Sequence, residues 1–281
     1  MEQSEKKALR IAACKIRMGA IESVWNAKSG HPGGALSAAD ILAYLYFHEM
    51  NVDPKDPKNP GRDRFVLSKG HSCPGLYAAL ALKGYFPWDE LKKLRHIGAM
   101  LQGHPDMKGT PGIDMSTGSL GQGVSAACGM ALAGKMDGKP YRVYTMLGDG
   151  EIDEGQVWEA AMFAAHHKLD NLCLILDWNG LQFDGTVEEV AGPGRLDEKF
   201  AAFGFDVQVI DGHDFDAIER AFGHAKTVGG KPSAILAKTV KGKGVSYMEN
   251  VVGWHGKAPN DEQYGVAMKE LRAALAALEA E

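Results

Sequence analysis

The first part of the chain carries apolar positions at helical spacing. Between residues 5 and 27 they fall on one face of a predicted helix, at Ile11, Cys14, Met18, Ile21 and Trp25. The pattern ends at Ser29-Gly30, and similar patterns predict further helices over 37–49, 74–84 and 121–134. The N-terminal portion is therefore predicted to be helical.

After residue 140 the pattern changes to short apolar runs that alternate with helical segments. The runs predict strands over 143–147, 172–177, 206–211 and 233–238. The segments that follow predict helices over 155–168, 195–203, 214–227 and 261–280. This alternation predicts an α/β fold, a mostly parallel sheet with helices on both faces. Without a linker or a repeat, the simplest interpretation is one domain over residues 1–281.

The last predicted helix has a clear start and a clear buried side. Asn260 is its expected N-cap, with Gln263 three residues on. Its apolar stripe is expected at Met268, Leu271, Leu275 and Leu278.

Composition narrows the class of protein. Glycine makes up 35 of 281 residues, well above the usual share of about 7%, which indicates many tight turns. The net charge of −5, with Lys and Arg spread along the chain, argues against nucleic-acid binding. The sequence has no signal-peptide pattern and no long uncharged apolar run, so we expect a cytoplasmic protein with no membrane contact. Its four scattered cysteines are expected to be reduced, packed thiols.

An acidic loop marks the end of the first predicted strand. The stretch LGDGEIDEG, residues 147–155, has four carboxylates and no Lys or Arg. Asp149 stands at this strand end, and Asn179 follows the next predicted strand. A crossover connection brings both side chains to the carboxyl edge of the sheet, where open α/β sheets bind ligands. With a carbonyl of the NGLQ turn they would form an oxygen-rich site for Mg²⁺ or Ca²⁺, through which the loop would bind phosphate. A plain Asp-Gly turn is the alternative interpretation.

Four histidines stand in glycine-containing loops. They are His31 in SGHPGG, His71 in SKGHS, His104 in QGHPD and His255 in GWHG. A neighbouring glycine leaves room for a ligand, and a neutral imidazole can exchange protons near neutral pH. A single loop histidine is more often a solvated or packing residue, but four in such settings favour a shared site. His166-His167 are instead predicted to be a charge at a helix C-terminus or a surface pair, and His213 and His224 are predicted to be surface residues.

These motifs resemble those of one enzyme family. GDG followed by an asparagine pair, with Trp178 in place of the first asparagine, is similar to the thiamine diphosphate fingerprint. GHPGG, SKGHS, GHPD, TGSLGQG, GDGEIDEG and the late WHG also occur in the order of the transketolase family, between residues 29 and 260. The resemblance implies that the chain has the thiamine diphosphate-binding fold and corresponds to its pyrophosphate-binding domain. It also implies reversible transfer of a two-carbon ketol unit from a ketose phosphate to an aldose phosphate.

The resemblance further implies a role for each matching residue. Asp149, Asn179 and the Leu181 carbonyl would hold the metal. Thiamine diphosphate would contact His71, Gly118, Ser119, Leu120, Gly150, Asn179 and His255. The catalytic set that lines the sugar pocket would be His31, His71, His104 and His255.

The remaining carboxylates of the acidic loop have separate expectations. By the resemblance, Glu154 would belong to a carboxylate cluster at a subunit interface. Glu151 and Asp153 are expected to be solvated or helix-start charges, favourable near a helix N-terminus.

The sequence matches only the first domain of a usual transketolase. In that family a second, pyrimidine-binding domain supplies the glutamate that protonates the aminopyrimidine ring and the basic residues that grip the sugar phosphate. We therefore expect a split enzyme, active with a C-terminal partner subunit that carries this domain, in an α2β2 assembly.

Several alternatives stay open at this point. Other thiamine enzymes, namely alpha subunits of two-oxo acid dehydrogenases and deoxyxylulose phosphate synthase, share part of the pattern. A transketolase-like subunit for an unusual ketose, branched or sulfonated, would keep the same histidines. A non-catalytic cofactor-binding domain is the third alternative. The segment VKGKG, residues 240–244, is a phosphate loop, a mobile flap or a solvated loop, and the resemblance favours a flap near the cofactor.

Overall fold

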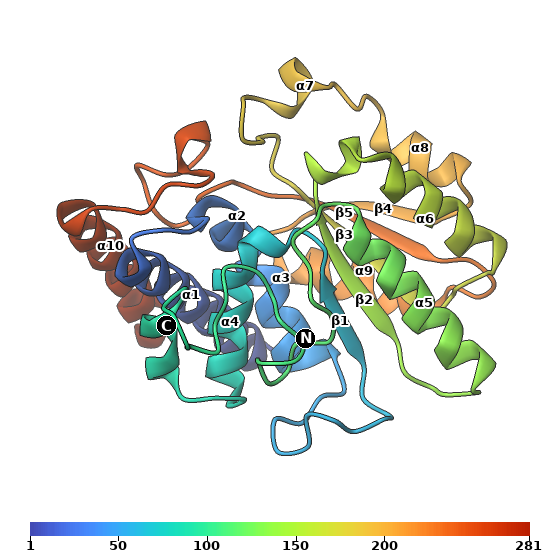
Figure 1. Cartoon of the computed structure of the whole chain (residues 1–281), viewed down its shortest axis with the longest axis horizontal. Coiled ribbons are helices and arrows are strands. Elements are labelled where there is room, and N and C mark those ends of the chain that lie inside the picture. The colour runs from blue at the N-terminus through green and yellow to red at the C-terminus, as the bar shows by residue number, and fades with distance from the viewer.

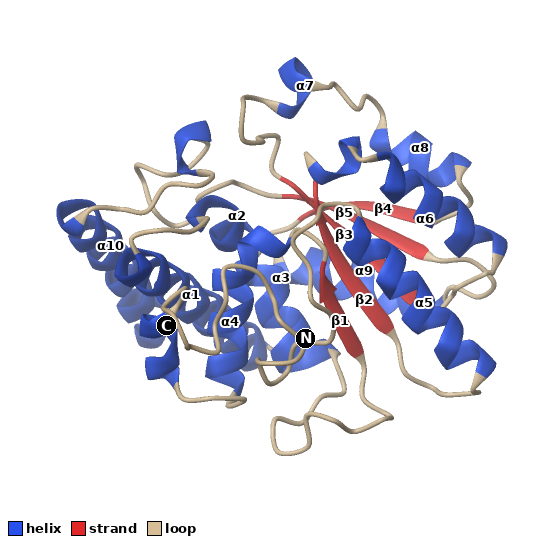
Figure 2. Cartoon of the chain, viewed as in Figure 1, coloured by secondary structure: helices blue, strands red, loops and turns tan.

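A five-stranded sheet runs through the middle of the computed structural model, which describes residues 1–281 (Figure 2). All neighbouring strands are parallel, in the order β1-β2-β3-β5-β4. The strands are β1 Arg64–Leu67, β2 Val143–Gly148, β3 Leu172–Trp178, β4 Asp206–Asp211 and β5 Ser233–Lys238. The predicted parallel sheet is confirmed. The sequence pattern missed β1, because its apolar part is only three residues long and follows a charged loop.

Helices cover both faces of the sheet, as predicted (Figure 1). On one side lie α5 Gln122–Met136, α6 Gly155–His166 and α8 Leu196–Ala202. On the other side lie α1 Gln3–Ala27, α2 Pro32–Ser37, α3 Ala39–Tyr44, α4 Cys73–Lys83, α9 Phe215–Thr227 and α10 Asp261–Ala280. The short helix α7 Val187–Val190 follows β3 in a surface segment.

The strand residues alternate between two hydrophobic cores. Phe65, Tyr144 and Ile175 pack with α1, α3, α4 and α9 in the larger core. Their chain neighbours Val66 and Leu174 pack with α5, α6 and α8 in the second core. The strands β2, β3 and β5 are buried on both faces and therefore appear in the sequence as continuous apolar runs, whereas the edge strand β4 is only partly buried.

The segment predicted as a helix over 37–49 is divided. Helix α2 begins at Pro32, α3 follows, and a π-turn, Leu45–Glu49, ends the run. The GHPGG stretch, predicted to be a loop, thus forms the first turn of α2, because proline is well suited to the first helical position. His31 becomes the residue that enters this helix.

The C-terminal helix α10 packs against α1 and carries the predicted cap. Asn260 Oδ1 accepts from the Gln263 amide, and Gln263 Oε1 accepts from the Asn260 amide. Met268 and Leu271 are buried, whereas Leu275 and Leu278 are only partly buried. The predicted stripe is therefore correct for its first half.

Two further expectations concern the whole chain. All four cysteines are free and buried, as predicted. None of the helices combines the length and the apolar character that crossing a membrane requires.

Candidate functional site

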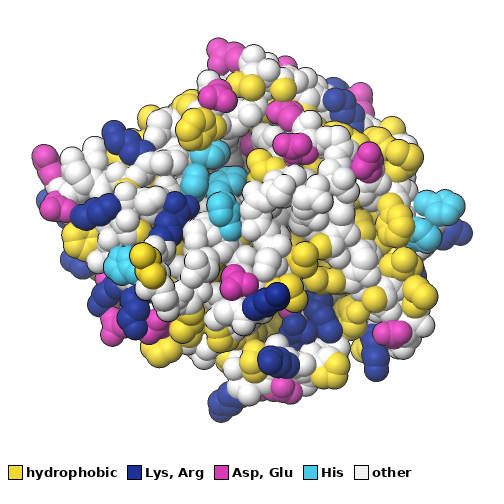
Figure 3. Space-filling model, viewed as in Figure 1, with side chains coloured by type: hydrophobic (Ala, Val, Ile, Leu, Met, Phe, Trp, Pro, Cys, Tyr) yellow, Lys and Arg dark blue, Asp and Glu magenta, His cyan; other side chains and the backbone are white.

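Three of the four predicted histidines meet above the carboxyl edge of the sheet. His31 enters α2, His71 lies in a turn after β1, and His255 follows the turn Val252–Trp254. Their ring centroids are 5.1 Å apart for His31 and His71, 5.6 Å for His31 and His255, and 5.0 Å for His71 and His255. Figure 3 shows histidine side chains gathered at a hollow in this face of the molecule. The predicted convergence is therefore present for these three.

The histidines border a cavity of about 230 Å³ that also contains most of the other predicted site residues. It is lined by His31, His71, Gly118, Leu120, Asp149, Gly150, Asn179, Leu181 and His255, among others. Two of the predicted catalytic and cofactor-binding residues do not line it. Ser119 is exposed, and His104 lies beside Gly118, where an added Cβ would stand 2.9 Å from the imidazole.

Asp149 and Asn179 lie at neighbouring strand ends, as the crossover argument predicted. Gly148, the last residue of β2, is paired with Asp177 near the end of β3. The Asp149 side chain is 2% exposed and accepts hydrogen bonds from the amides of Gly150 and Gly180. Burial, reinforced by the charge of Asp177, raises the pKa of Asp149 to about 7. A carboxylate in such a place is stabilised by a cation.

The Asn179 side chain points its oxygen toward the following turn. Its Oδ1 accepts from the Leu181 amide at 3.2 Å, and its Nδ2 donates to Asp177 at 3.3 Å. Carboxylate, amide and carbonyl oxygens thus come together without any cluster of three or more His, Cys, Asp or Glu side chains. This donor set suits a hard cation better than a transition metal.

Lys241 is a site residue that the sequence interpretation did not select. It follows β5 in the VKGKG segment and is 2% exposed. Its Nζ donates to the Leu181 carbonyl at 2.7 Å and stands 2.9 Å from His255 Nδ1. Burial lowers the pKa of Lys241 to about 8. The segment therefore forms part of the cavity wall. This position agrees with the expectation of a flap near the cofactor and disagrees with the expectation of a solvated loop.

A buried ion pair beneath the cavity was also missed. Lys69 Nζ donates to Asp177 and, at 2.9 Å, to the Gly34 carbonyl. Asp177 also accepts from the hydroxyls of Ser37 and Thr239. Burial opposes ionisation of Asp177, but Lys69 and these donors outweigh it and hold its pKa below the usual value. The pair joins β1 and β3 to the helix that His31 enters.

The carboxylates of the acidic loop occupy different environments. Glu151, expected to be solvated, is 2% exposed and accepts from Ser68 Oγ and from the amides of Gly121 and Gly148. The expectation of a solvated side chain was wrong for Glu151, because the turn after Asp149 directs it inward to those donors, whereas the expectation of a helix-start charge holds, since Glu151 begins the short helical turn Glu151–Asp153. Asp153 is exposed, as expected, and Glu154 is exposed at the start of α6.

The surface assignment was right for three of the other histidines and wrong for one. His166, His167 and His224 are exposed. His213 is half-buried, because its ring lies between Asp40 and the Val240 amide, to which it is hydrogen-bonded.

The three clustered histidines are held neutral. Burial is the main cause and lowers the pKa of His31 to about 4, of His71 to about 2 and of His255 to about 3. His255 Nδ1 faces the Lys241 ammonium, so it accepts, and the ring proton lies on Nε2. His31 Nδ1 and Ser72 Oγ are buried with no hydrogen-bond partner in the protein. Neutral rings and unpaired polar atoms around a cavity define a site for a polar ligand.

A parallel α/β sheet with this Asp–Asn pair and histidine cluster at its carboxyl edge belongs to the class of thiamine diphosphate-binding domains. A family model described as the transketolase thiamine diphosphate-binding domain matches residues 9–275, and the chain belongs to the transketolase family. The alternative thiamine enzymes are set aside by this match.

Two similar relatives have nearly the length of this chain. The 6-deoxy-6-sulfo-D-fructose transketolase subunit SqwG of Clostridium sp. (strain MSTE9) is 52% identical over 256 residues, 91% of this chain and 93% of that protein. An apulose-4-phosphate transketolase subunit of Phocaeicola vulgatus is 42% identical over 275 residues, 98% of this chain and 98% of that protein.

Solved transketolases share the fold over a longer protein. The crystal structure of transketolase from Campylobacter jejuni is similar at a TM-score of 0.89 and 33% identity, covering 99% of this chain and 46% of that chain. The chain therefore spans about half the length of the solved transketolases that it matches.

Proposed function

We propose that this chain is the N-terminal subunit of a two-chain transketolase. With a C-terminal partner it transfers a two-carbon ketol unit from a ketose phosphate to an aldose phosphate, using thiamine diphosphate and Mg²⁺. The observation that carries this proposal is the meeting of three neutral histidines with buried Asp149 and Asn179 in one cavity. The relatives of similar length, which are named as transketolase subunits, support it.

The chemistry of the donors fits Mg²⁺. Asp149, Asn179 Oδ1 and the Leu181 carbonyl would supply three oxygen ligands, and Mg²⁺ usually completes its shell with water and phosphate. Burial raises the pKa of Asp149 although Lys241 and Lys69 oppose this effect, and no cation bonds the carboxylate directly. The same oxygens are compatible with Ca²⁺.

The cavity also has the features that thiamine diphosphate requires. His31 Nδ1 and Ser72 Oγ are unpaired. A Cβ at Gly34 would stand 2.6 Å from Ser72 Oγ, so only glycine fits beside this hydroxyl. The residues that would hold the cofactor are His71, Gly118, Ser119, Leu120, Gly150, Asn179 and His255, and the Lys241 ammonium adds a positive charge. Bound thiamine diphosphate supplies the carbon nucleophile and the electron sink that C–C bond cleavage requires.

The histidines would orient the sugar and move its protons. A neutral imidazole can accept a proton from a hydroxyl and return it at the other side of the reaction. His255 would present Nε2–H, and His31 has Nδ1 without a partner, so the two offer different hydrogen-bonding groups. His104, at the edge of the cavity near Gly118, would complete the catalytic set of His31, His71, His104 and His255.

The partner subunit would complete the site in an α2β2 assembly. Glu154, exposed at the start of α6, would lie at the interface between subunits. The subunit designations of the two relatives of similar length support a separate partner. The four free thiols agree with a cytoplasmic location.

A second substrate class is favoured by one observation. The relative at 52% identity is named for 6-deoxy-6-sulfo-D-fructose, and the one at 42% for apulose-4-phosphate. We therefore include an unusual ketose, sulfonated or branched, as the second candidate donor.

The test is a transfer assay with the purified chain alone and with its partner. Transfer from a panel of phosphorylated, sulfonated and branched ketoses to an aldose phosphate is measured with and without Mg²⁺. We expect transfer only with the partner, and calorimetry is expected to show Mg²⁺-dependent cofactor binding. Normal transfer by the chain alone would refute the split enzyme. Absence of Mg²⁺-dependent cofactor binding even with the partner would refute the enzymatic function, whereas cofactor binding without transfer would favour the non-catalytic cofactor-binding domain.

A further inference from the structure

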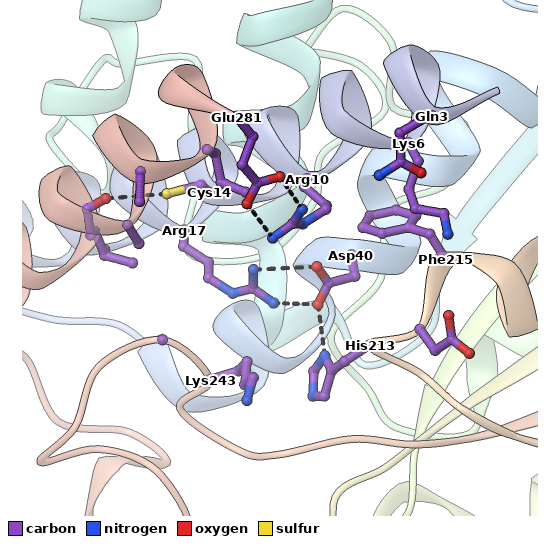
Figure 4. A pocket seen from close by; sticks show the side chains of 16 residues that line it. Gln3, Lys6, Arg10, Cys14, Arg17, Asp40, His213, Phe215, Lys243 and Glu281 are labelled. Carbon is purple, nitrogen blue, oxygen red and sulfur yellow. Dashed lines mark hydrogen bonds and ion pairs between the residues drawn. The ribbon is translucent and has the colours of Figure 1, made fainter. Parts of the chain in front are cut away.

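A second cavity, of about 670 Å³, lies between α1, α10 and the segment 243–244 (Figure 4). Along its wall Arg17, Asp40 and His213 form a hydrogen-bonded chain, which we call the buried triad. The Arg17 guanidinium donates to both carboxylate oxygens of Asp40, and His213 Nδ1 lies 2.6 Å from Asp40 Oδ2. The mechanism proposed above uses none of these residues.

The buried triad is connected to the cofactor cavity at both ends. At one end, Arg17 Nε donates to the Leu36 carbonyl of α2, the helix that His31 enters. At the other end, the Val240 amide donates to His213 Nε2 at 2.9 Å. Val240 directly precedes Lys241, whose Nζ lies in the cofactor cavity.

The hydrogen bonds fix the protonation of His213. A backbone amide can only donate, so Nε2 of His213 must be the acceptor. The ring proton is then on Nδ1, where it is donated to Asp40, and the ring is neutral. Burial opposes ionisation of Asp40, but Arg17 and His213 outweigh it and hold its pKa below the usual value. An ionised Asp40 therefore orients the histidine that holds the Val240 amide.

The segment around Lys241 is held from the opposite side by α2. The Gly242 amide donates to the Gly33 carbonyl at 3.0 Å, and a Cβ at Gly33 would stand 3.0 Å from Lys241 Cγ. Lys241 is thus clamped between α2 and His213, so a shift at Val240 would displace its ammonium from Leu181 and His255.

We propose that His213 is a positioning residue: through its Nε2 it holds the backbone at Val240 and so sets the place of the Lys241 ammonium in the cofactor cavity. The expected effect on cofactor affinity rests on the function proposed above. The hydrogen bond by which His213 holds the Val240 backbone does not depend on that function.

Two substitutions at His213 test its two hydrogen bonds separately, the one to Val240 and the one to Asp40. In His213→Gln the longer side chain places its amide near the former Nε2, so its oxygen can accept from Val240. In His213→Asn the shorter side chain places its amide near the former Nδ1, so it can donate to Asp40 but leaves the Val240 amide without an acceptor. His224→Asn is the matched control, because His224 is exposed and bonds a carboxylate far from this segment.

The first measurement is amide hydrogen exchange at Val240 in the full chain without cofactor. We expect exchange in His213→Asn to be faster by about 2- to 10-fold, the loss of one neutral hydrogen bond. His213→Gln and His224→Asn should remain close to wild type. The proposal would be overturned if exchange in His213→Asn were unchanged, or if it were slower than in His213→Gln. Either result would show that His213 has a purely structural role through Asp40.

The second measurement is the dissociation constant for thiamine diphosphate with Mg²⁺ and the partner. The affinity should fall by about 2- to 10-fold in His213→Asn and less in His213→Gln. If wild type binds no cofactor, the proposed function fails, while the exchange result still decides the hold on Val240. If affinity is unchanged although exchange has risen, the positioning of Lys241 is refuted.

Imidazole nitrogen NMR of the wild-type chain gives a test that does not depend on a folded variant. We expect His213 to be neutral at pH 7 with the proton on Nδ1. A proton on Nε2 would contradict the Val240 hydrogen bond and overturn the proposal.

Discussion

The two cavities on either side of the segment 241–244 differ in how their polar groups are satisfied. In the larger one, Arg10 pairs with Glu281, Lys6 with Asp216, and Arg17 with Asp40. In the smaller one, His31 Nδ1 and Ser72 Oγ have no partner, and Asp149 is buried without a counter-charge at hydrogen-bond distance. The larger volume belongs to the cavity that needs no ligand. Unsatisfied buried groups that line a cavity, and not the volume of the cavity, therefore distinguish the binding site from the larger cavity.

The largest expected effect concerns the ion pair beneath the smaller cavity. Lys69→Met leaves Asp177 buried and unpaired, and should lower the free energy of unfolding by about 3–5 kcal/mol. Urea denaturation of the apo chain measures it. Lys69→Met with Asp177→Asn removes the uncompensated charge and should recover much of the loss. A double variant no more stable than the single one would show that charge is not the cause.

The next effect tests the ligand side of the smaller cavity. Asp149→Ala should weaken Mg²⁺-dependent binding of thiamine diphosphate by more than about 100-fold, since even indirect partners of metal ligands cost about 10–100-fold. Calorimetry with the partner present measures it. Asp153→Ala, in the same loop but exposed, is the matched control and should bind like wild type. Equal affinity of both variants would remove Asp149 from the metal site.

A pair of glycines tests how closely the smaller cavity is packed. Gly118 has φ of +143°, and a Cβ there would stand 2.9 Å from His104. Gly118→Ala should therefore lower the free energy of unfolding by about 1–3 kcal/mol. Gly129→Ala, in the interior of α5 with open space around it, should raise it by about 0.5–1 kcal/mol. If the free energy of unfolding changed in the same direction in both variants, the result would contradict the close packing at Gly118.

A smaller effect follows from the neutral histidines. Burial lowers the pKa of His31 from 6.5 to about 4. The unfolded chain therefore binds a proton at this residue as the pH falls below 6.5 and the native state does not, until about pH 4. The part of the free energy of unfolding that comes from the neutral state of His31 is present above pH 6.5 and is lost as the pH falls toward 4. His31→Gln should make the free energy of unfolding fall less steeply between these values, as measured by urea denaturation at several pH values. An unchanged slope would mean that His31 is not held neutral.

The smallest expected effect belongs to the larger cavity. Arg10 and Glu281 are each about half exposed, 40% and 46%. Arg10→Ala should change the free energy of unfolding by no more than about 1 kcal/mol and leave cofactor affinity unchanged, as calorimetry checks. A loss of affinity would show that the larger cavity also takes part in binding.

Local sequence patterns predicted the sheet and the edge at which a ligand would bind. They did not predict the contacts that depend on which strands are neighbours in the sheet. Asp149 and Asn179 were predicted because they follow consecutive strands. Lys241 follows β5, and nothing in its own segment indicates that β5 lies beside β3.

Partners distant in sequence explain the other misses. Lys69 required β1, whose apolar run was too short to detect, and the burial of His213 depends on Asp40, 173 residues away. Glu151 was misjudged because its partners, Ser68 and Gly121, come from other elements.

The cofactor cavity has a consequence for the biosynthesis of the chain. Its floor contains an ion pair between residues 108 apart, and its walls include residues as distant in sequence as His31 and His255. Such non-local contacts close large loops, which slows folding relative to the formation of local helices such as α1 and α5. The cavity is complete only after His255 has left the ribosome. A ligand bound there therefore acts on the finished fold, which it stabilises by mass action, and does not guide the emerging chain.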